Sequence, residues 1–212
     1  MTPDELAAFQ ERKARIRRQA HDNRNAQEHK DELSITICEK FVSLPEYAAA
    51  ETVMFYLDAR SEVRTRHYMP TALLSGKRIV VPYCVEDILH LFWLESMDEL
   101  AIGMWKILEP PEELRQIPEK QIDVKDVDLV MVPGVAFDRR GARMGHGKGY
   151  YDKLLEGARP GTPFVALAFE CQVFPEIPTA PHDIFMDKII TEKAVYPGKG
   201  RRPLADVHQS AS

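Results

Sequence analysis

Residues 128–155, DLVMVPGVAFDRRGARMGHGKGYYDKLL, predict a buried strand, a glycine-rich loop and a helix in direct succession. The run DLVMVP (128–133) is short and apolar, which is typical of a strand that is buried on both faces. The helix is expected from about Gly149 to Glu156. Ligands of open α/β sheets bind in the crevice at the carboxyl ends of the strands, so the loop is the expected binding site.

The loop GARMGHGKGYYD (141–152) has the composition of an anion-binding site. Its glycines allow backbone N–H groups to approach an anion closely, and the helix that follows presents its positive end. Arg143 and Lys148 add charges that suit phosphate oxygens. The loop is not a Walker A motif, because Gly149 follows Lys148 and Ala142 stands where the first glycine is required. It does not match GxGxxG either.

Asp152 follows the last glycine after two tyrosines and helps to distinguish two interpretations of the loop. On the glycines alone, a surface turn with solvated charges is a strong alternative to a binding site. A carboxylate behind a phosphate loop is where a Mg²⁺ ligand that bridges to phosphates would lie. The alternative for Asp152 itself is a favourable interaction with the dipole of the helix.

Apolar runs and helical patterns alternate along most of the remaining chain. Further buried strands are predicted at 52–57, 77–83, 90–95, 163–169 and 187–191. Helices are predicted from a capping box at Thr2 and Glu5 to about Asn23, at 27–43, and at 64–75 with Pro70 as an interruption. This alternation predicts a single α/β domain over residues 1–200, with an N-terminal helical segment and a mostly parallel sheet between helices. Residues 109–127 are expected to be a surface connection, and residues 201–212 a flexible tail.

Composition and charge exclude several classes of protein. The net charge of −5, from 28 basic and 33 acidic residues, argues against a broad nucleic-acid or membrane surface but not against a local anion site. The three cysteines show no CxxC pattern, which favours a reducing compartment without disulfides. No apolar run is long enough to cross a membrane, and residues 1–18 lack the apolar segment of a secretory signal. A cytoplasmic, monomeric protein is expected.

The segment PGVAFDRRGARMGHGKGYYDKLL (133–155) closely resembles the signature of 5-formyltetrahydrofolate cyclo-ligases, also called methenyltetrahydrofolate synthetases. The resemblance continues in order over nearly the whole chain. The other matching segments are Lys13 and Arg17 as KxxxR, EVRT (62–65), GMWKILEP (103–110), LAFECQ (167–172) and PHDIFMDKIITE (181–192). The family's fold is a three-layer α/β domain with a mixed sheet, which is therefore the expected fold here.

The implied reaction converts 5-formyltetrahydrofolate and ATP to 5,10-methenyltetrahydrofolate, ADP and phosphate. An N-formyl amide is a poor electrophile, so its oxygen must first become a leaving group. Phosphoryl transfer to that oxygen gives an iminium phosphate, which N10 of the folate attacks before phosphate departs. The protein's part in such a reaction is mainly positioning and charge stabilisation.

The resemblance also implies which residues form the site. The implied ATP-binding residues are Lys13, Arg17, Arg143, Gly145, His146, Gly147, Lys148, Gly149, Tyr150 and Tyr151. The implied folate-contacting residues are Leu57, Glu62, Trp105, His146 and Tyr150. Asp152 and Asp183 are the implied Mg²⁺ ligands, with Asp187 as the alternative to Asp183. Arg143 and Lys148 are the implied catalytic residues, because a guanidinium suits the oxygens of a transferring phosphoryl group.

Simpler alternatives accompany these assignments. Lys13 and Arg17 lie four residues apart on one helix face, which is also the pattern of a solvated face. Trp105 is equally compatible with a core position, and a core position for one of the two tyrosines is a less favoured alternative. Arg64 stands where many relatives carry an acid, so details of the folate site are open. For the whole protein, the alternatives are a phosphosugar isomerase-like enzyme and a folate- or nucleotide-binding relative without turnover.

Overall fold

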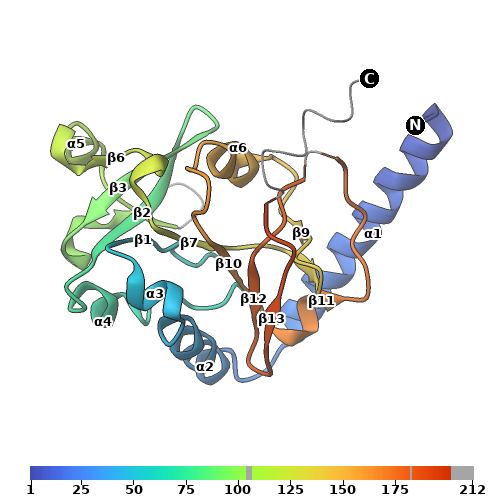
Figure 1. The fold of residues 1–212 in the computed structure, drawn as a ribbon, viewed down its shortest axis with the longest axis horizontal. Helices are drawn as coiled ribbons and strands as arrows, with labels where there is room; N and C mark the ends of the chain where they lie inside the picture. The colour runs from blue at the N-terminus through green and yellow to red at the C-terminus, as the bar shows by residue number, and fades with distance from the viewer. Residues whose placement is uncertain (104–106, 182, 202–212) are drawn as a thin grey trace.

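The computed structural model describes residues 1–103, 107–181 and 183–201. At its centre lies a mixed sheet (Figure 1). Its strands are β1 (Thr52–Met54), β2 (Arg78–Val85), β3 (Ile88–Leu94), β6 (Gln121–Ile122), β7 (Leu129–Val132), β10 (Phe164–Leu167), β12 (Lys188–Ile190) and β13 (Val195–Pro197). Their spatial order is β13-β12-β10-β7-β1-β2-β3-β6. The pairs from β12 to β2 are parallel, and β13, β3 and β6 add antiparallel pairs at the two edges.

The parallel strands are continuous apolar runs because both of their faces are buried. Along β7, Leu129 and Met131 face one core, whereas Val130 and Val132 face the other. The first core also contains residues of α2 (Lys30–Val42), α3 (Pro45–Ala49) and α4 (Met69–Leu73), and the second contains residues of α6 (Tyr150–Glu156). Figure 1 shows α6 on one side of the sheet and these three helices on the other. The expected single three-layer α/β domain is therefore confirmed.

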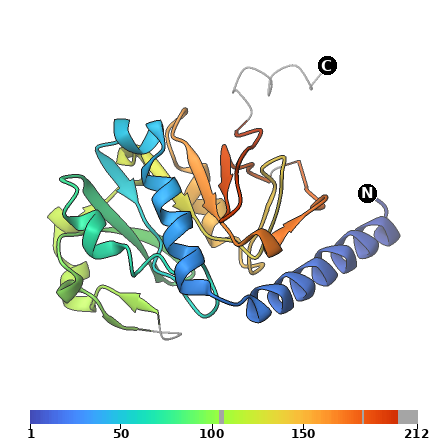
Figure 2. The same ribbon diagram turned by 90° about the horizontal axis from the view of Figure 1, so that it is seen from below.

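The N-terminal helix, α1 (Pro3–Ala26), begins with the predicted capping box: Thr2 and Glu5 each accept a hydrogen bond from the other's backbone N–H. It is the long helix that extends from the body of the molecule in Figure 2. Its later turns contribute Ile16 and Ala20 to a third, smaller core. None of the helices within the described residues is long and apolar enough to cross a membrane.

Several predicted boundaries differ from the observed ones, each for a local reason. The helix predicted at 64–75 is only α4, because Pro70 lies in its first turn, where the missing N–H is tolerated, and so begins the helix instead of interrupting it. The strand predicted at 52–57 pairs only over β1, although Phe55, Tyr56 and Leu57 remain buried. A short helix, α3, was missed after α2; Pro45 starts it.

The predicted surface connection at 109–127 contains small elements and supplies an edge strand, β6, which pairs with β3. The short elements here and upstream are η1 (Met97–Glu99), β4 (Ala101–Ile102), β5 (Leu108–Glu109), α5 (Glu112–Arg115), η3 (Pro118–Lys120) and η4 (Val124–Asp126). A period-2 pattern is too weak in two residues to be recognised in a sequence. Residues 202–212 of the predicted tail lie outside the described residues, so that boundary stays a prediction.

A second, three-stranded sheet interrupts the simple strand–loop–helix order that the sequence predicted. The hairpin β8 (Ala136–Asp138) and β9 (Arg143–Met144) follows β7, and β11 (Val173–Phe174), which comes after η5 (Glu170–Gln172), pairs with β8. Gly141 therefore belongs to the hairpin turn and not to a phosphate loop. Its φ is +95°, and a Cβ there would lie 2.4 Å from the carbonyl oxygen of Met186, so only glycine fits. The loop before α6 is reduced to residues 145–149.

The strand order defines where a ligand site is expected. From β1 the chain proceeds to β2 on one side, whereas from β7 it proceeds to β10 and β12 on the other. The chain thus reverses its direction across the sheet between β1 and β7, and the loops that leave these two strands separate at their carboxyl ends. The loop after β1 contains Glu62, and the excursion after β7 contains Arg143 and residues 145–149. The ligand site predicted from the sequence is expected at this point of reversal.

Candidate active site

Three segments that are distant in sequence meet at the carboxyl ends of β1 and β7. The guanidinium of Arg17, on α1, donates from Nε to the carbonyl oxygen of Gly145 at 3.1 Å. Arg143, on β9, donates from Nη1 to the carbonyl oxygen of Pro133, just beyond β7, at 3.4 Å. His146 Nε2 lies 3.7 Å from Glu62 Oε1. The structure thus brings the KxxxR helix, the glycine loop and the EVRT segment together.

Arg143 and Asp152 form an ion pair, with 2.5 Å between Nη2 and Oδ1. The arginine side chain is only 4% exposed, whereas that of Asp152 is 47% exposed. Within the described residues, Nε of Arg143 is buried without a hydrogen-bond partner. A buried donor without an acceptor costs free energy, so the fold leaves this guanidinium incompletely satisfied. Arg143 is therefore a pre-placed cation with unused donor capacity.

Lys13 and Arg17 both point to other parts of the chain. Lys13 Nζ lies 3.4 Å from Asp183 Oδ2, and each of these side chains is about one fifth exposed. The guanidinium of Arg17 reaches the glycine loop so closely that a Cβ at Gly147 would lie 3.7 Å from it. One face of α1 therefore adjoins both the loop and the segment that carries Asp183. This geometry favours a shared binding face over a purely solvated one.

Two of the three glycines of the loop have backbone conformations that other residues rarely adopt. Gly147 has φ +99°, and Gly149, the N-cap of α6, has φ +71°. Lys148 Nζ lies 5.7 Å from the centre of the Tyr150 ring, and the Tyr150 hydroxyl hydrogen-bonds to Asp87 in the turn between β2 and β3. The exposed side of the loop is thus linked through Lys148 and Tyr150 to the turn between β2 and β3.

The two tyrosines have different surroundings. Tyr150 lies at the surface, next to Lys148 and Asp87. Tyr151 packs against both cores of the sheet, and burial, then the nearby Glu62 charge, raises the pKa of its hydroxyl strongly. Arg143 opposes this rise and lies 5.8 Å from the Tyr151 ring. Tyr151 is thus a packing residue whose ring lies between the two cores and the Arg143 guanidinium. This position matches the packing alternative for one tyrosine.

The predicted folate side is lined by Leu57 and Glu62. Leu57 is buried, and Glu62 is 12% exposed with its Oε2 accepting a hydrogen bond from the Ala59 N–H at 2.9 Å. His21 of α1 packs on His146, with 5.3 Å between the ring centres. Burial, followed by the charge of Arg24, lowers the pKa of His21, which favours its neutral form. No motif signal marked His21, because its role depends on the fold.

Trp105 and Arg64 are the two remaining residues of the predicted folate side. Trp105 lies outside the described residues. Arg64 pairs with Asp31 of α2, with 2.5 Å between Nε and Oδ1. Arg64 therefore has an acidic partner on the neighbouring helix α2.

The geometry separates the two candidate metal ligands in HDIFMD. Asp183 Oδ2 accepts a hydrogen bond from the Ala180 N–H and lies beside Lys13. Asp187 Oδ2 instead accepts from the N–H of Phe164, the first residue of β10, at 2.7 Å. That contact places Asp187 at the amino ends of the parallel strands, opposite the candidate site. Asp183 is therefore the better candidate of the two.

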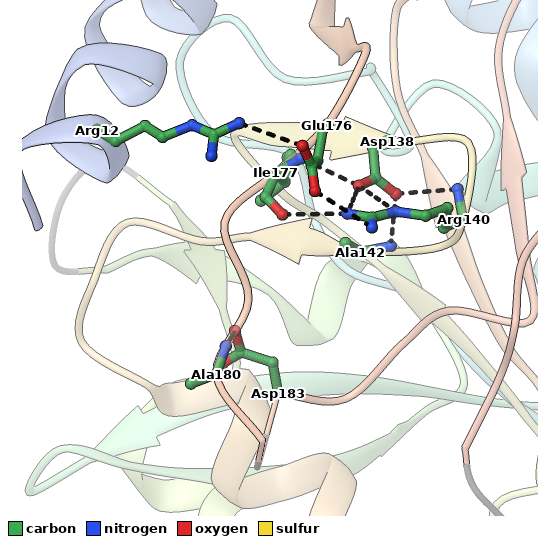
Figure 3. A network of polar contacts seen from close by, with 8 residues as sticks. All are labelled: Arg12, Asp138, Arg140, Ala142, Glu176, Ile177, Ala180 and Asp183. Carbon is green, nitrogen blue, oxygen red and sulfur yellow. Dashed lines mark hydrogen bonds and ion pairs between the residues drawn. The ribbon is translucent and has the colours of Figure 1, made fainter. Parts of the chain in front are cut away.

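A buried polar network holds the segment that leads to Asp183 (Figure 3). Asp138 is fully buried and accepts hydrogen bonds from the backbone N–H groups of Arg140, Ala142 and Ile177 and from the guanidinium of Arg140. Glu176 receives further contacts at 3.4 Å from Arg140 and from Arg12 of α1. The network thus ties the β8–β9 hairpin, α1 and residues 176–183 to one another. Sequence reasoning missed it, because FDRRG has no pattern of its own.

The chemistry of the acidic side chains suits a metal that is shared with a ligand. Among the described residues, no group of three or more His, Cys, Asp or Glu side chains could hold a metal ion alone. Mg²⁺ usually takes only one or two carboxylates and completes its shell with phosphate oxygens and water. Asp152 and Asp183, each beside a cation of the same site, fit that second arrangement.

Comparisons with known proteins identify the family and the fold. The model of the 5-formyltetrahydrofolate cyclo-ligase family matches residues 9–192. A probable 5-formyltetrahydrofolate cyclo-ligase of Schizosaccharomyces pombe is 35% identical over 179 residues, which cover 78% of this chain and 86% of the relative. The solved structure of Aquifex aeolicus 5,10-methenyltetrahydrofolate synthetase superposes with a TM-score of 0.76 at 32% identity, and the match covers 93% of this chain and 98% of that one.

Proposed function

The chain belongs to the 5-formyltetrahydrofolate cyclo-ligase family, and from this premise we propose how its own residues carry out the reaction. It is an enzyme that cyclises 5-formyltetrahydrofolate to 5,10-methenyltetrahydrofolate, with ATP as co-substrate. The observation that carries the assignment of roles is the contact of Arg17 with the glycine loop, beside the pair of Arg143 and Asp152. This contact supports a common phosphate-binding site for Lys13, Arg17, Arg143 and Lys148.

ATP phosphates bind between α1 and the loop at 145–149 in this proposal. Lys13 and Arg17 supply charge from the helix, and the glycines allow the backbone N–H groups of the loop to approach phosphate oxygens. Lys148 adds a mobile cation at the exposed side. The positive end of the short helix α6 contributes least, because it has only two turns. A guanidinium that is already buried needs little reorganisation when charge develops on the phosphoryl group, so Arg143 acts in the transition state.

The folate binds on the other side of His146. Glu62 accepts hydrogen bonds from the amino and ring N–H groups of the pterin, and Leu57 packs against its flat face. His146 lies on the phosphate loop and faces Glu62, so it marks where the two substrates meet. The formyl oxygen then lies next to the terminal phosphate of ATP, which is the geometry that phosphoryl transfer requires. Attack of N10 on the resulting iminium phosphate closes the ring and releases phosphate.

A Mg²⁺ held by Asp152 and Asp183 would neutralise phosphate charge during the transfer. The contact of Arg143 is with Oδ1 of Asp152, so Oδ2 stays available for the metal. Lys13 would turn from Asp183 toward phosphate when ATP binds, which leaves that carboxylate available as well. A cytoplasmic location, a monomeric state and the lack of nucleic-acid or membrane partners remain predictions of the sequence; one relative, from Arabidopsis thaliana, is named as mitochondrial.

The activity is tested by incubating the protein with 5-formyltetrahydrofolate, ATP and Mg²⁺ and following the near-UV absorbance of the methenyl product. One ADP and one phosphate should form for each methenyl group, and omission of ATP should stop the reaction. Binding of both substrates without product would instead support a relative without turnover. Interconversion of sugar phosphates, with no change in absorbance, would support the isomerase alternative.

A further inference from the structure

Arg24 is a buried charge that the proposed reaction does not use. It lies in the last turn of α1, is 1% exposed and is among the largest fully buried side chains of the described residues. Burial lowers the pKa of its guanidinium, and the nearby charge of Glu62 opposes this effect. A buried cation is costly unless it is hydrogen-bonded and has an opposite charge close by. The contacts of Arg24 must therefore compensate for the cost of burying its charge.

The contacts of Arg24 join three segments of the candidate site. Its Nε donates to the hydroxyl oxygen of Ser61 at 3.0 Å, and its Nη1 donates to the carbonyl oxygen of Gly134 at 3.3 Å. The Ser61 hydroxyl in turn donates to Asn25 Oδ1, on the same helix, at 2.8 Å. Gly134 also accepts from Gln172 Nε2 at 3.0 Å. One planar guanidinium thus fixes the end of α1 to the loop after β1 and to the chain just beyond β7.

Each of these anchor points is the neighbour of a candidate site residue. Ser61 precedes Glu62 directly, and Gly134 follows Pro133, whose carbonyl oxygen accepts the hydrogen bond from Arg143. Arg24 is also seven residues, or two turns, after Arg17 and so lies on nearly the same face of α1. Arg24 therefore links the residue before Glu62 to the residue after Pro133, the hydrogen-bond partner of Arg143.

We propose that Arg24 is a positioning residue, which orients Glu62 for the pterin through the Ser61 contact and its own charge. The inference rests on the proposed role of Glu62. A residue that only stabilises the fold would need neither the charge nor the specific contact with Ser61. The positioning role predicts an effect on folate recognition that is separate from the effect on stability.

The test measures kcat, the KM for 5-formyltetrahydrofolate and the melting temperature of Ser61→Ala, Arg24→Lys and Arg24→Gln. Ser61→Ala leaves the charge in place and removes one contact at a half-buried position, so the protein should fold. Its KM for the folate should rise several-fold, with kcat and the KM for ATP little changed. Arg24→Gln should raise the KM for the folate on the order of tenfold or more. Arg24→Lys should raise it less, because lysine keeps the charge but lacks the planar guanidinium that donates in two directions.

Two controls separate the inference from the proposed function. Arg18→Gln removes an exposed positive charge from the same helix and should leave all constants unchanged. Glu62→Gln tests the assignment on which the inference rests, and its effect on the folate KM should not add to that of Arg24→Gln in the double variant. If Glu62→Gln raises the KM but Ser61→Ala and Arg24→Lys do not, the positioning role is wrong. Melting temperatures that fall with an unchanged folate KM lead to the same conclusion. If Glu62→Gln leaves the KM for the folate unchanged, the proposed role of Glu62 is wrong, and the positioning role of Arg24 that rests on it is wrong as well.

Discussion

At the scale of single residues, the site is defined by cations that are paired before any substrate arrives. Arg143 is held by Asp152, and Lys13 by Asp183. Paired and partly buried groups lose less side-chain entropy on binding than free ones, so they are well suited to positioning a phosphate. The same pairs explain why arginine occupies position 143, since a planar fork can contact Asp152, the Pro133 carbonyl and a ligand in one plane.

Arg143→Ala should lower kcat and kcat/KM together, because the guanidinium is placed for charge that develops only in the transition state. A loss on the order of 3 kcal/mol, or about 100-fold, is expected. Arg143→Lys should recover only part of it, since an ammonium lacks the bidentate geometry. Steady-state kinetics with saturating folate and varied ATP provide the measurement. A raised KM for ATP with unchanged kcat would show that Arg143 only binds the ground state.

Asp152→Asn should nearly abolish turnover while the protein remains folded. The amide keeps the shape of the side chain and can still accept a hydrogen bond from Arg143, but it is a poor ligand for Mg²⁺. Turnover, together with far-UV circular dichroism to monitor folding, gives the answer. Full activity of the folded variant would remove Asp152 from the mechanism.

At the scale of secondary-structure elements, α1 and the β8–β9 hairpin together position the residues of the candidate site. The helix has its own capping box but few buried residues, so its position depends on what it contacts. It is fixed by the small core around Ile16 and Ala20, and by polar contacts of Arg12, Arg17 and Arg24. Substitutions on α1 can therefore affect the site without unfolding the domain.

Arg17→Ala should raise the KM for ATP or lower kcat, with little change in melting temperature. The side chain is part-buried and its main contact is the carbonyl oxygen of Gly145, so the loss affects the loop more than the core. Arg15→Ala, a change at an exposed position of the same helix, is the matched control and should have wild-type kinetics. Identical kinetics for both variants would return Lys13 and Arg17 to the solvated-face alternative.

Asp138→Asn should lower the free energy of unfolding by about 2–4 kcal/mol, because it removes the charge that the buried network is built around. An amide must also place an N–H₂ group where the carboxylate now accepts from Arg140 or Ile177. Urea denaturation compares it with Asp98→Asn, an exposed site where a change within about 0.5 kcal/mol is expected. Equal stability of the two variants would contradict the structural role of the network.

At the scale of the whole molecule, the reversal of strand order between β1 and β7 decides where the substrates meet. Two loops that leave neighbouring parallel strands in opposite directions open a crevice between them. Here one loop carries Glu62 and the other carries Arg143 and the glycines. The arrangement lets a single domain hold two substrates without an interface between domains.

ATP with Mg²⁺, in the absence of folate, should raise the melting temperature of the whole protein. At a ligand concentration 100 times Kd the gain is about 2.7 kcal/mol, which corresponds to roughly 5–10 °C for a domain of this size. Chelation of the metal should reduce this shift. In Asp152→Asn the shift should be nearly the same with and without Mg²⁺. Scanning calorimetry tests both statements, and a shift in the wild type that does not depend on metal would argue against the Mg²⁺ proposal.

The sequence by itself determined the features that depend on short-range pattern or on a specific motif. The apolar runs around Val53, Val130 and Val165 indicated buried strands, and Thr2 with Glu5 fixed the start of α1. The glycine loop identified the family. These signals are local, because hydrophobic period, capping and backbone freedom depend on only a few neighbouring residues.

Only the tertiary structure decided which distant residues meet. It placed Asp187 at the amino ends of the strands and Asp183 beside Lys13, although the two aspartates are four residues apart. It assigned Gly141 to a hairpin turn, it showed that Tyr151 is partly buried against both cores, and it revealed Arg24, which no motif contains. Long-range contacts of this kind follow from strand order and packing, and the residue types at the separate positions do not encode them individually.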